Sequence, residues 1–327
     1  MRSLPRTMKR RSMPPPTSRR EALSRWKWFF ALLLQAAPVG CDQMRSVERI
    51  TVRGSDTEVN LVFQLAEAYM ARDSNVSISI AGGGSGVGIA ALLNGKVDVA
   101  NSSRPLKDKE IALARMRGIR PVAHVFAADA LVVIVHPQTG VDSLTLEQLG
   151  RIYSGELRDW SAVGGRPGPI SLYGRQSNSG TYVYFRDKVV GRDFSPALKQ
   201  MNGTAQIVES VLRDPYAIGY VGLGYVVKAD GSVREGIRIV RLKKDKRHPA
   251  VSPLDEAALR SGLYPLVRPL YQFTKGHPSG KLREFLQFEG SPLGQQIIRR
   301  NGYLPPWPEL LQADFSSVSS PVEGHHF

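Results

Sequence analysis

The sequence has few of the cysteine and histidine residues that bind a metal ion or cross-link a small domain through disulfides. It contains one cysteine, Cys41, and six histidines, of which only His325 and His326 are close together. A single cysteine excludes an intramolecular disulfide and any metal site built from several cysteines. The scattered histidines form neither a metal-binding pattern nor a Ser-His-Asp pattern. We therefore expect no metal and no cofactor.

Long apolar runs and familiar catalytic loops are missing as well. The apolar run at residues 28–34 is shorter than the ~20 residues that a membrane-spanning helix needs. The glycine-rich stretch at residues 82–88 is not followed by Gly-Lys-Ser/Thr and breaks the G-x-G-x-x-G spacing, so it is no nucleotide-binding loop. Neither Ser85 nor Ser179 lies in a G-x-S-x-G nucleophile elbow. These absences predict a protein that is not an enzyme.

What the sequence has instead is an excess of basic residues, 44 against 29 acidic ones, for a formal net charge of +15. Residues 1–40 carry about half of that excess, because they hold nine basic residues and one acidic residue. The rest of the sequence does not interleave aromatic and basic residues in the manner of a nucleic-acid-binding surface. We therefore expect no nucleic-acid partner.

The first 40 residues have the order of an export signal: a basic segment, the short apolar run at 28–34, and then small residues. Val39-Gly40-Cys41 resembles the end of a lipobox, although Pro38 departs from it, and Ser18 to Leu23 resembles a twin-arginine motif. We predict that residues 1–40 are a lipoprotein-like signal peptide and that Cys41 is lipidated. The mature protein is then periplasmic or on the cell surface, anchored to a bacterial membrane. A basic tail beside a free cysteine is the alternative.

From residue 48 onward, the 327-residue chain is long enough for two domains and alternates between strand and helix patterns. Three strand–loop–helix units in a row predict an α/β fold with parallel strands. Further strands and helices follow, then a basic loop at 238–248 and a tail. The predicted strands are 50–53, 76–80, 97–100, 131–135, 170–173, 217–222 and 266–273, and the predicted helices are 59–70, 87–93, 146–152, 282–298 and those beginning near 107 and 182.

Three loops share one design, in which a strand ends, glycine and hydroxyl residues follow, and a helix begins. They are centred on Ser55-Asp56-Thr57, Gly84-Ser85-Gly86 and Ser179-Gly180-Thr181. A helix N-terminus presents unpaired N–H groups and partial positive charge, and glycine lets an anion approach the backbone. Arg175 precedes the third loop and could pair with two oxygens of a tetrahedral anion. Ordinary helix capping explains any one loop alone, but three together with an arginine favour an anion site.

With these loops in place, residues 48–308 resemble a phosphate-binding protein of the phosphate-specific ABC transporter, a periplasmic substrate-binding protein of the type 2 PBP-like family. The resemblance covers nearly the whole mature chain. The matching pieces are Gly54 to Thr57, Gly83 to Gly86, Val97 to Val99, Tyr153 to Gly155 with Asp159-Trp160, Arg175 to Thr181, Ile218 to Tyr225, and Ser291 to Gln295.

The resemblance implies two α/β lobes, each a mixed sheet flanked by helices, joined by two hinge crossovers near 127–133 and 263–271. Residues 48–127 with 264–308 would form one lobe, 128–263 the other, and 309–327 a mobile tail. A monomer would close on inorganic phosphate and deliver it to ABC transporter permease subunits in the membrane. The ligand-binding residues implied are Ser55, Asp56, Thr57, Gly84, Ser85, Gly86, Ser103, Arg175, Ser179, Gly180 and Thr181.

One residue departs from the family pattern. Well-known members have an Asp where this chain has Ser103. A buried carboxylate at that place accepts a hydrogen bond from protonated phosphate and repels sulfate, which has no proton to give. Asp56 or Asp129 could take over this task, and our hypothesis is Asp56, because it lies in a predicted anion loop. The alternatives left open are another oxyanion such as sulfate or molybdate, a sensor without a transporter, and a phosphatase.

Overall fold

The computed structural model describes residues 47–311. The predicted signal peptide, the lipidation at Cys41 and residues 312–327 of the predicted tail lie outside these residues. Residues 309–311, at the start of that tail, are part of a helical turn. The strands are β1 Glu48–Gly54, β2 Val76–Ala81, β3 Val99–Ser102, β4 Val122–Val135, β5 Ser143–Thr145, β6 Ser171–Arg175, β7 Lys199–Met201, β8 Ala217–Gly222, β9 Arg238–Ile239, β10 Arg241–Lys243 and β11 Val267–Thr274.

Helices alternate with the strands over most of the described chain, as the sequence predicted. The α-helices are α2 Val59–Met70, α3 Ser85–Leu93, α4 Asp108–Met116, α5 Leu146–Tyr153, α6 Gly180–Phe185, α7 Thr204–Arg213, α8 Glu256–Arg260, α9 Gly280–Glu289 and α10 Pro292–Arg300. Three 3₁₀-helices, η1 Pro137–Thr139, η2 Trp160–Val163 and η4 Leu223–Tyr225, and one π-helical segment, η3 Arg186–Val190, complete the described elements.

Nine strands form one mixed sheet in the order β2-β1-β3-β11-β4-β8-β6-β7, with β9 beside the far end of β4, and β5 and β10 form a separate parallel pair. Strands β1, β2 and β3 are parallel, which confirms the prediction from the three strand–loop–helix units. Strand β11 runs antiparallel to both of its neighbours, and β6 is parallel to β7 and β8. The carboxyl ends of β1 and β3 therefore meet at one edge of the sheet, where the first predicted loops begin.

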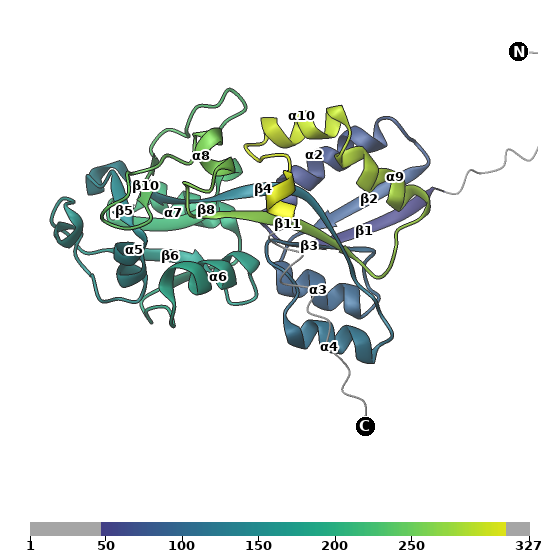
Figure 1. Cartoon of the computed structure of the whole chain (residues 1–327), viewed down its shortest axis with the longest axis horizontal. Coiled ribbons are helices and arrows are strands. Elements are labelled where there is room, and N and C mark those ends of the chain that lie inside the picture. Colours follow the sequence, from purple (N-terminus) through teal and green to yellow (C-terminus); the bar gives the residue numbers. More distant parts are fainter. Residues whose placement is uncertain (1–46, 312–327) are drawn as a thin grey trace, which may run out of the picture. The chain divides into compact units, whose positions relative to one another are not determined.

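Two long strands connect the two halves of the sheet (Figure 1). Residues 122–130 of β4 pair with β11, whereas residues 131–135 of the same strand pair with β8. We call the part around β1–β3 the first lobe and the part around β5–β8 the second lobe. Strands β4 and β11 are the crossovers between the lobes.

Each lobe has its own buried apolar side chains. In the first lobe, α2, α9 and α10 cover one face of the sheet and α3 and α4 the other (Figure 1). In the second lobe, the core includes Val133, Phe185 and Tyr220, with the last two rings stacked 4.0 Å apart. The hydroxyl of Tyr220 accepts a hydrogen bond from the backbone N–H of Arg175 at 3.2 Å, so this core also fixes the end of β6.

Two sequence predictions about local structure are wrong. The predicted helix 282–298 is divided into α9 and α10, because Ser291 caps a new helix through the N–H of Gly294 at 3.2 Å and Pro292 suits its first position. The predicted basic loop 238–248 contains β9 and β10. These short strands pair with β4 and β5, which lie about 100 residues away in sequence and gave no local signal.

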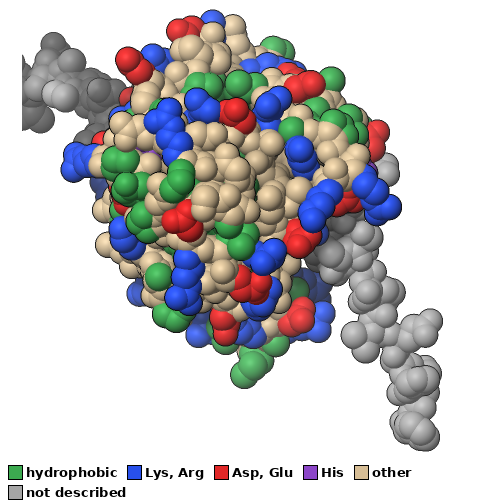
Figure 2. Space-filling view, turned by 90° about the vertical axis from the view of Figure 1, so that its left-hand side faces the viewer, with side chains coloured by type: hydrophobic (Ala, Val, Ile, Leu, Met, Phe, Trp, Pro, Cys, Tyr) green, Lys and Arg blue, Asp and Glu red, His purple; other side chains and the backbone are tan. Residues whose placement is uncertain are grey.

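The surface shows no concentration of one charge on the face drawn in Figure 2, where basic and acidic side chains are interspersed. Within residues 47–311, no helix combines the length and the apolar character that crossing a membrane requires.

A buried carboxyl group in the first lobe should make stability depend on pH. Burial raises the pKa of Glu289 to about 8, and its Oε1 accepts a hydrogen bond from Gln272 Nε2 at 3.0 Å. Between its ordinary pKa and about 8, the unfolded chain has lost this proton while the folded chain keeps it, so stability falls as pH rises. Glu289→Gln should therefore be stabilised relative to the wild type at pH 8 but not at pH 4.5, by on the order of a few kcal/mol.

Urea unfolding of both proteins at pH 4.5 and pH 8 measures this difference. Glu284→Gln, an exposed position on the same helix, is the matched control and should not change the slope between pH 6 and 8, because the pKa of Glu284 is lowered by Lys281. Equal pH dependence in the wild type and Glu289→Gln would show that Glu289 is ionised in the folded protein.

Candidate functional site

Four hydroxyl side chains from the two lobes meet in the interior of the molecule. Thr57, Ser85 and Ser103 come from the first lobe and Thr181 from the second, and none is more than 1% exposed. The Oγ1 atoms of Thr57 and Thr181 are 2.8 Å apart, the Oγ atoms of Ser85 and Ser103 are 3.4 Å apart, and Ser103 Oγ lies 3.5 Å from Thr181 Oγ1. We call these four residues the hydroxyl cluster.

The cluster forms because each residue follows a strand end or begins a helix. Thr57 lies between β1 and α2, Ser85 is the first residue of α3, and Ser103 follows β3 directly. Thr181 lies in the first turn of α6. Gly180 lets the second lobe approach the first because it has no side chain. A Cβ atom at this position would lie only 2.4 Å from Ser85 Oγ and 2.7 Å from Ser103 Oγ.

A buried ion pair lies beside the hydroxyl cluster, between Arg268 of β11 and Asp129 of β4. The two residues face each other across the antiparallel strands and are 2% and 0% exposed. Arg268 donates to Asp129 Oδ2 from Nη2 at 2.8 Å and from Nε at 3.1 Å. We call Arg268 and Asp129 the hinge pair, because they lie on the crossover strands.

The hinge pair is connected to the hydroxyl cluster through one nitrogen. Arg268 Nη2 lies 3.1 Å from Thr181 Oγ1 and 3.3 Å from Thr57 Oγ1, so it contacts one hydroxyl from each lobe. Its Nη1 is 3.4 Å from the carbonyl oxygen of Ser103. A guanidinium surrounded by hydroxyl groups and shielded from water is well suited to hold an oxyanion.

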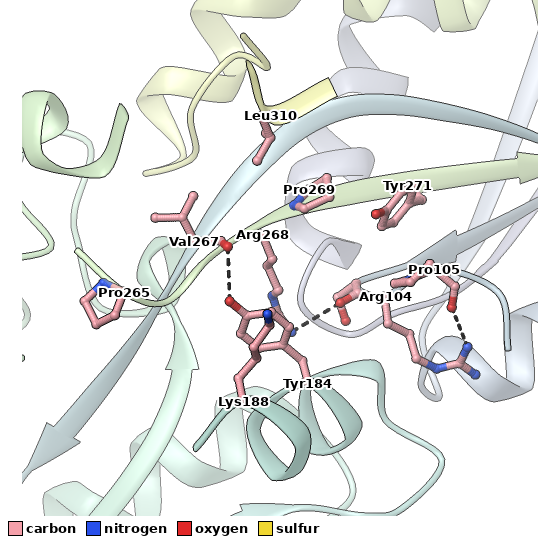
Figure 3. A pocket seen from close by; sticks show the side chains of 11 residues that line it. Arg104, Pro105, Tyr184, Lys188, Pro265, Val267, Arg268, Pro269, Tyr271 and Leu310 are labelled. Atoms are coloured by element: carbon pink, nitrogen blue, oxygen red, sulfur yellow. Dashed lines mark hydrogen bonds between the residues drawn. The ribbon is translucent and has the colours of Figure 1, made fainter. Parts of the chain in front are cut away.

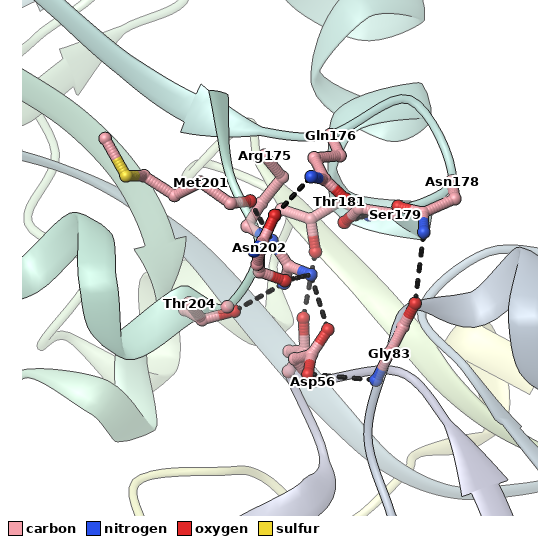
Figure 4. Close-up of polar contacts among 12 residues, drawn as sticks. Asp56, Gly83, Arg175, Gln176, Asn178, Ser179, Thr181, Met201, Asn202 and Thr204 are labelled. Carbon is pink, nitrogen blue, oxygen red and sulfur yellow. Dashed lines mark hydrogen bonds and ion pairs between the residues drawn. The ribbon is translucent and has the colours of Figure 1, made fainter. Parts of the chain in front are cut away.

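Arg175, the cation expected from the sequence, is placed differently. It is 1% exposed, and its Nη2 pairs with Asp56 of the first lobe and donates to the carbonyl oxygen of Asn202 at 2.8 Å (Figure 4). Nη1 donates to Thr204 Oγ1 at 2.8 Å and Nε to the carbonyl oxygen of Met201 at 3.3 Å. Four of the five N–H groups of its guanidinium therefore have protein acceptors. The ion pair with Asp56 joins the two lobes.

Asp56 has a donor for each carboxylate oxygen. Oδ2 pairs with Arg175, and Oδ1 accepts from the backbone N–H of Gly83 at 3.1 Å. The backbone carbonyl of Asp56 accepts from the hydroxyl of Tyr225, which is another contact between the lobes. Asp56 therefore connects two loops of the first lobe to the second lobe.

The remaining predicted ligand residues lie around the hydroxyl cluster but have other partners. Ser55 is buried and donates its backbone N–H to Asn101 at 2.9 Å. Gly86 donates its backbone N–H across the lobes to the carbonyl of Asn178 at 3.0 Å, and Gly84 lies against the same carbonyl. Ser179 caps α6 by accepting from the backbone N–H of Thr181 at 3.2 Å. Ser179 thus has the capping role that the sequence left open.

Glu58 is a carboxyl residue that directly follows Thr57 of the hydroxyl cluster in the sequence. It is fully buried, and neither of its carboxyl oxygens has a hydrogen-bond partner within residues 47–311. Burial raises the pKa of Glu58 well above its usual range, which favours the neutral form. A neutral Glu58 adds no negative charge behind the hydroxyl cluster.

A pocket of about 380 Å³ adjoins the cluster, where Ser103 and Arg268 line it (Figure 3). The ring of Tyr184 lies over the Arg268 guanidinium, 5.2 Å from its Cζ atom, and the Tyr184 hydroxyl donates to the carbonyl of Val267 at 3.0 Å. The Arg268 side chain is therefore held by Tyr184 of the second lobe as well as by Asp129 of β4. Within residues 47–311, no group of three or more His, Cys, Asp or Glu residues is arranged to hold a metal ion.

The comparisons with known proteins agree with this architecture. Residues 42–291 match the family model described as the PBP superfamily domain. Over 270 residues the chain is 33% identical to the phosphate-binding protein PstS of Pseudomonas aeruginosa, covering 77% of this chain and 81% of that protein. The chain belongs to the PstS family of the PBP superfamily. Members of this family are substrate-binding proteins, which are not a class of enzyme.

Solved structures of phosphate-transport binding proteins share the mixed α/β fold of this chain. A putative phosphate ABC transporter substrate-binding protein with bound phosphate from Clostridium perfringens gives a TM-score of 0.70 at 25% identity, covering 80% of this chain and 100% of that one. An ABC-type phosphate transport receptor from Vibrio cholerae gives 0.62 at 25% identity, covering 79% and 100%. The predicted fold class is therefore confirmed.

In this member of the PstS family, sequence reasoning missed Arg268 and considered Asp129 only as the alternative to Asp56. Neither lies in a glycine–hydroxyl loop, which was the signal used to find ligands. A usable signal was present, because each is the single charged residue in an otherwise apolar strand segment, at residues 127–135 and 266–271. Opposite charges in two buried strands predict that the strands are neighbours with the charges paired.

Proposed function

We propose that this protein binds inorganic phosphate between its two lobes, outside the cytoplasm, and delivers it to the permease of an ABC transporter. The observation that carries the proposal is the hydroxyl cluster, in which hydroxyl groups from both lobes meet around the guanidinium of Arg268. Four hydroxyls and a guanidinium offer hydrogen-bond donors from several directions, which suits a tetrahedral oxyanion. The relatives named phosphate-binding protein support phosphate as that oxyanion.

The contacts between the lobes also support binding by closure. The ion pair of Arg175 with Asp56 and the hydrogen bond from Gly86 to Asn178 each join one lobe to the other. Binding between lobes stabilises the closed form, because only there do both lobes contact the ligand. We assign 48–127 with 264–308 to one lobe and 128–263 to the other, and the ligand contacts to the hydroxyl cluster, Arg268 and the surrounding loop residues.

The proposal extends to location and assembly. A signal peptide at 1–40 with lipid on Cys41 would hold the protein at a bacterial membrane, periplasmic or at the cell surface, next to its permease. We propose a monomer, because one chain supplies both lobes of the site. Mass spectrometry of the mature N-terminus tests the lipid, and an unmodified Cys41 thiol in membrane-purified protein would exclude it.

Isothermal titration of the mature protein with phosphate, sulfate and molybdate tests the ligand. We expect one phosphate per chain and binding of the other two anions weaker by about three orders of magnitude. Thr181→Val removes one hydroxyl of the cluster without changing the side-chain shape much, and should weaken phosphate binding at least about tenfold. Tight binding of sulfate or molybdate without phosphate would instead assign the protein to another oxyanion.

The matched control for Thr181→Val is Thr139→Val. Thr139 is also a buried threonine of the second lobe, but its hydroxyl donates to the carbonyl of His136 at 2.9 Å, away from the cluster. This variant should lose stability and keep its phosphate affinity. Equal affinity loss in the two variants would mean that the cluster is not the ligand site.

A further inference from the structure

We propose that the groove between residues 104–107 of the first lobe and residues 183–188 of the second is another anion site, which takes a small anion carrying several negative charges, such as a short polyphosphate. The site is separate from the hydroxyl cluster. Its occupant contacts both lobes at once, so it should strengthen phosphate binding rather than compete with it. That coupling rests on the proposed function, whereas the anion site itself does not.

The first observation is a pocket of about 420 Å³ with one side from each lobe. Residues 104–107, between β3 and α4, form the side of the first lobe, and residues of α6 and η3 form the side of the second. Arg104, Tyr184 and Lys188 also line the pocket drawn in Figure 3, so the two pockets adjoin. A volume in this range is typical of sites for small molecules. We call the pocket of residues 104–107 and 183–188 the basic groove.

The second observation is the charge of the basic groove. Its lining residues include four basic side chains, two from each lobe, and one acidic side chain. These are Arg104 and Lys107 of the first lobe, Arg186 and Lys188 of the second, and Asp187. Within residues 47–311, Arg186 pairs with Asp187 at 2.8 Å, and neither lysine has an ion pair. Two unpaired cations from opposite lobes therefore line the same groove.

The third observation is a buried donor without a partner. Arg104 is 5% exposed, and its Nη1 and Nη2 donate to the carboxylate of Glu110 at 2.8 and 2.7 Å. Its Nε is buried and has no hydrogen-bond partner among the described residues. Buried polar atoms almost always have a partner, so an arginine that lines a pocket and keeps an N–H open indicates an acceptor on a ligand.

The charges on the two sides of the basic groove repel each other. Burial lowers the pKa of Lys107, and the positive charges of Arg104 and of Arg186, which belongs to the other lobe, lower it further. Lys109 adds to this shift and Glu110 opposes it. An anion between the lobes is attracted by both sides and reduces their repulsion. Several separated negative charges serve both sides at once, which a single charged centre does less well.

Tyr184 connects the basic groove to the phosphate site. Its ring lies over the Arg268 guanidinium, and its hydroxyl donates to the carbonyl of Val267 at 3.0 Å. Helix α6, which carries Tyr184, also carries Thr181 of the hydroxyl cluster. An anion that holds α6 and η3 against residues 104–107 therefore holds Thr181 against the first lobe. Bound phosphate should tighten the groove for its anion by the same factor, because coupling between two sites is reciprocal.

Titration calorimetry with tripolyphosphate tests the site, with saturating phosphate in the cell and the syringe alike. We expect one tripolyphosphate per chain in addition to the bound phosphate, with an affinity that falls as the salt concentration rises. Lys107→Gln and Lys188→Gln should each weaken this binding about tenfold, because each removes one unpaired cation. Sulfate, which has one charged centre, should bind the groove more weakly than tripolyphosphate.

The matched controls are Lys109→Gln and Lys244→Gln, which remove one exposed lysine from each lobe outside the basic groove. Both should bind tripolyphosphate like the wild type. An equal loss in the controls would mean that the net charge of the protein attracts the anion, and the groove would not be its site. Absence of tripolyphosphate binding to the phosphate-loaded wild type would overturn the inference outright.

The reverse titration separates the inference from the proposed function. Phosphate affinity of the wild type should rise about fivefold when tripolyphosphate is present, and less in Lys107→Gln and Lys188→Gln. An unchanged affinity would overturn the coupling, and a lower one would place tripolyphosphate in the phosphate site and refute a separate groove. If the wild type binds no phosphate, the proposed function fails, while tripolyphosphate binding and its loss in the two lysine variants still decide the groove.

Discussion

Replacing Arg268 by glutamine should weaken phosphate binding by about three orders of magnitude, more than the loss of any other single side chain of the site. Arg268 is the described cation whose nitrogen contacts cluster hydroxyls from both lobes. Removing one partner of a buried, hydrogen-bonded charge pair costs about 2–5 kcal/mol, because the other charge is left uncompensated. Isothermal titration measures the affinity, and thermal unfolding reports the accompanying loss of stability.

A double variant separates the two effects. Arg268→Gln with Asp129→Asn removes both buried charges, so stability should return most of the way to that of the wild type. Phosphate affinity should stay low, because the guanidinium is still missing. Recovery of affinity together with stability would contradict a direct role for Arg268 and would assign the hinge pair to folding alone.

Arg175→Gln gives the comparison that the sequence reasoning calls for, since Arg175 was the cation expected to hold the anion. The hydrogen bonds of its guanidinium go to Asp56, Met201, Asn202 and Thr204 and to no hydroxyl of the cluster, and its ion pair with Asp56 joins the lobes. We expect a weaker effect than for Arg268→Gln, about tenfold, because closure loses one contact. A larger loss than for Arg268→Gln would return Arg175 to the position of principal ligand.

Gly180→Ala should abolish tight phosphate binding without unfolding the protein. The added Cβ atom would lie 2.4 Å from Ser85 Oγ and 2.7 Å from Ser103 Oγ, so the first turn of α6 could no longer reach the first lobe. Alanine is a better helix residue than glycine, so the second lobe itself should be at least as stable as before. We expect about a 100-fold loss of affinity or more, measured by titration.

The matched control is Gly203→Ala, just before α7 in the same lobe, where nothing lies within 4 Å of an added Cβ atom. This variant should bind phosphate like the wild type. Small-angle scattering with and without phosphate should show compaction in the wild type and in Gly203→Ala only. Compaction and tight binding in Gly180→Ala would mean that the lobes do not close at this contact.

The sequence allowed much of the site to be predicted, because part of it is built from local motifs. Thr57, Ser85 and Thr181 each lie where a strand gives way to a helix, and a parallel sheet brings such places to one edge. The structure places these three side chains, with Ser103, within hydrogen-bonding distance of one another. Glycine and hydroxyl residues in short loops carry this information in the sequence itself.

The hinge pair could not be assigned in the same way, because it depends on the pairing of strands far apart in the chain. Arg268 and Asp129 are 139 residues apart and become neighbours only through the register of β4 with β11. Register is set by tertiary packing and has no local signature. The partner of Arg175 was missed for the same reason, since Asp56 reaches it only where the two lobes meet.

The position of Arg268 and Asp129 on the crossover strands has a consequence for the order of events during capture. Strands near a pivot move little when two lobes separate, so we expect this guanidinium to keep its place in an open form, while Thr181 moves away with its lobe. An incoming anion should therefore meet a preset hydrogen-bond donor first and the enclosing hydroxyls afterwards. The residence time of the bound anion should then be governed by how rarely the two lobes separate.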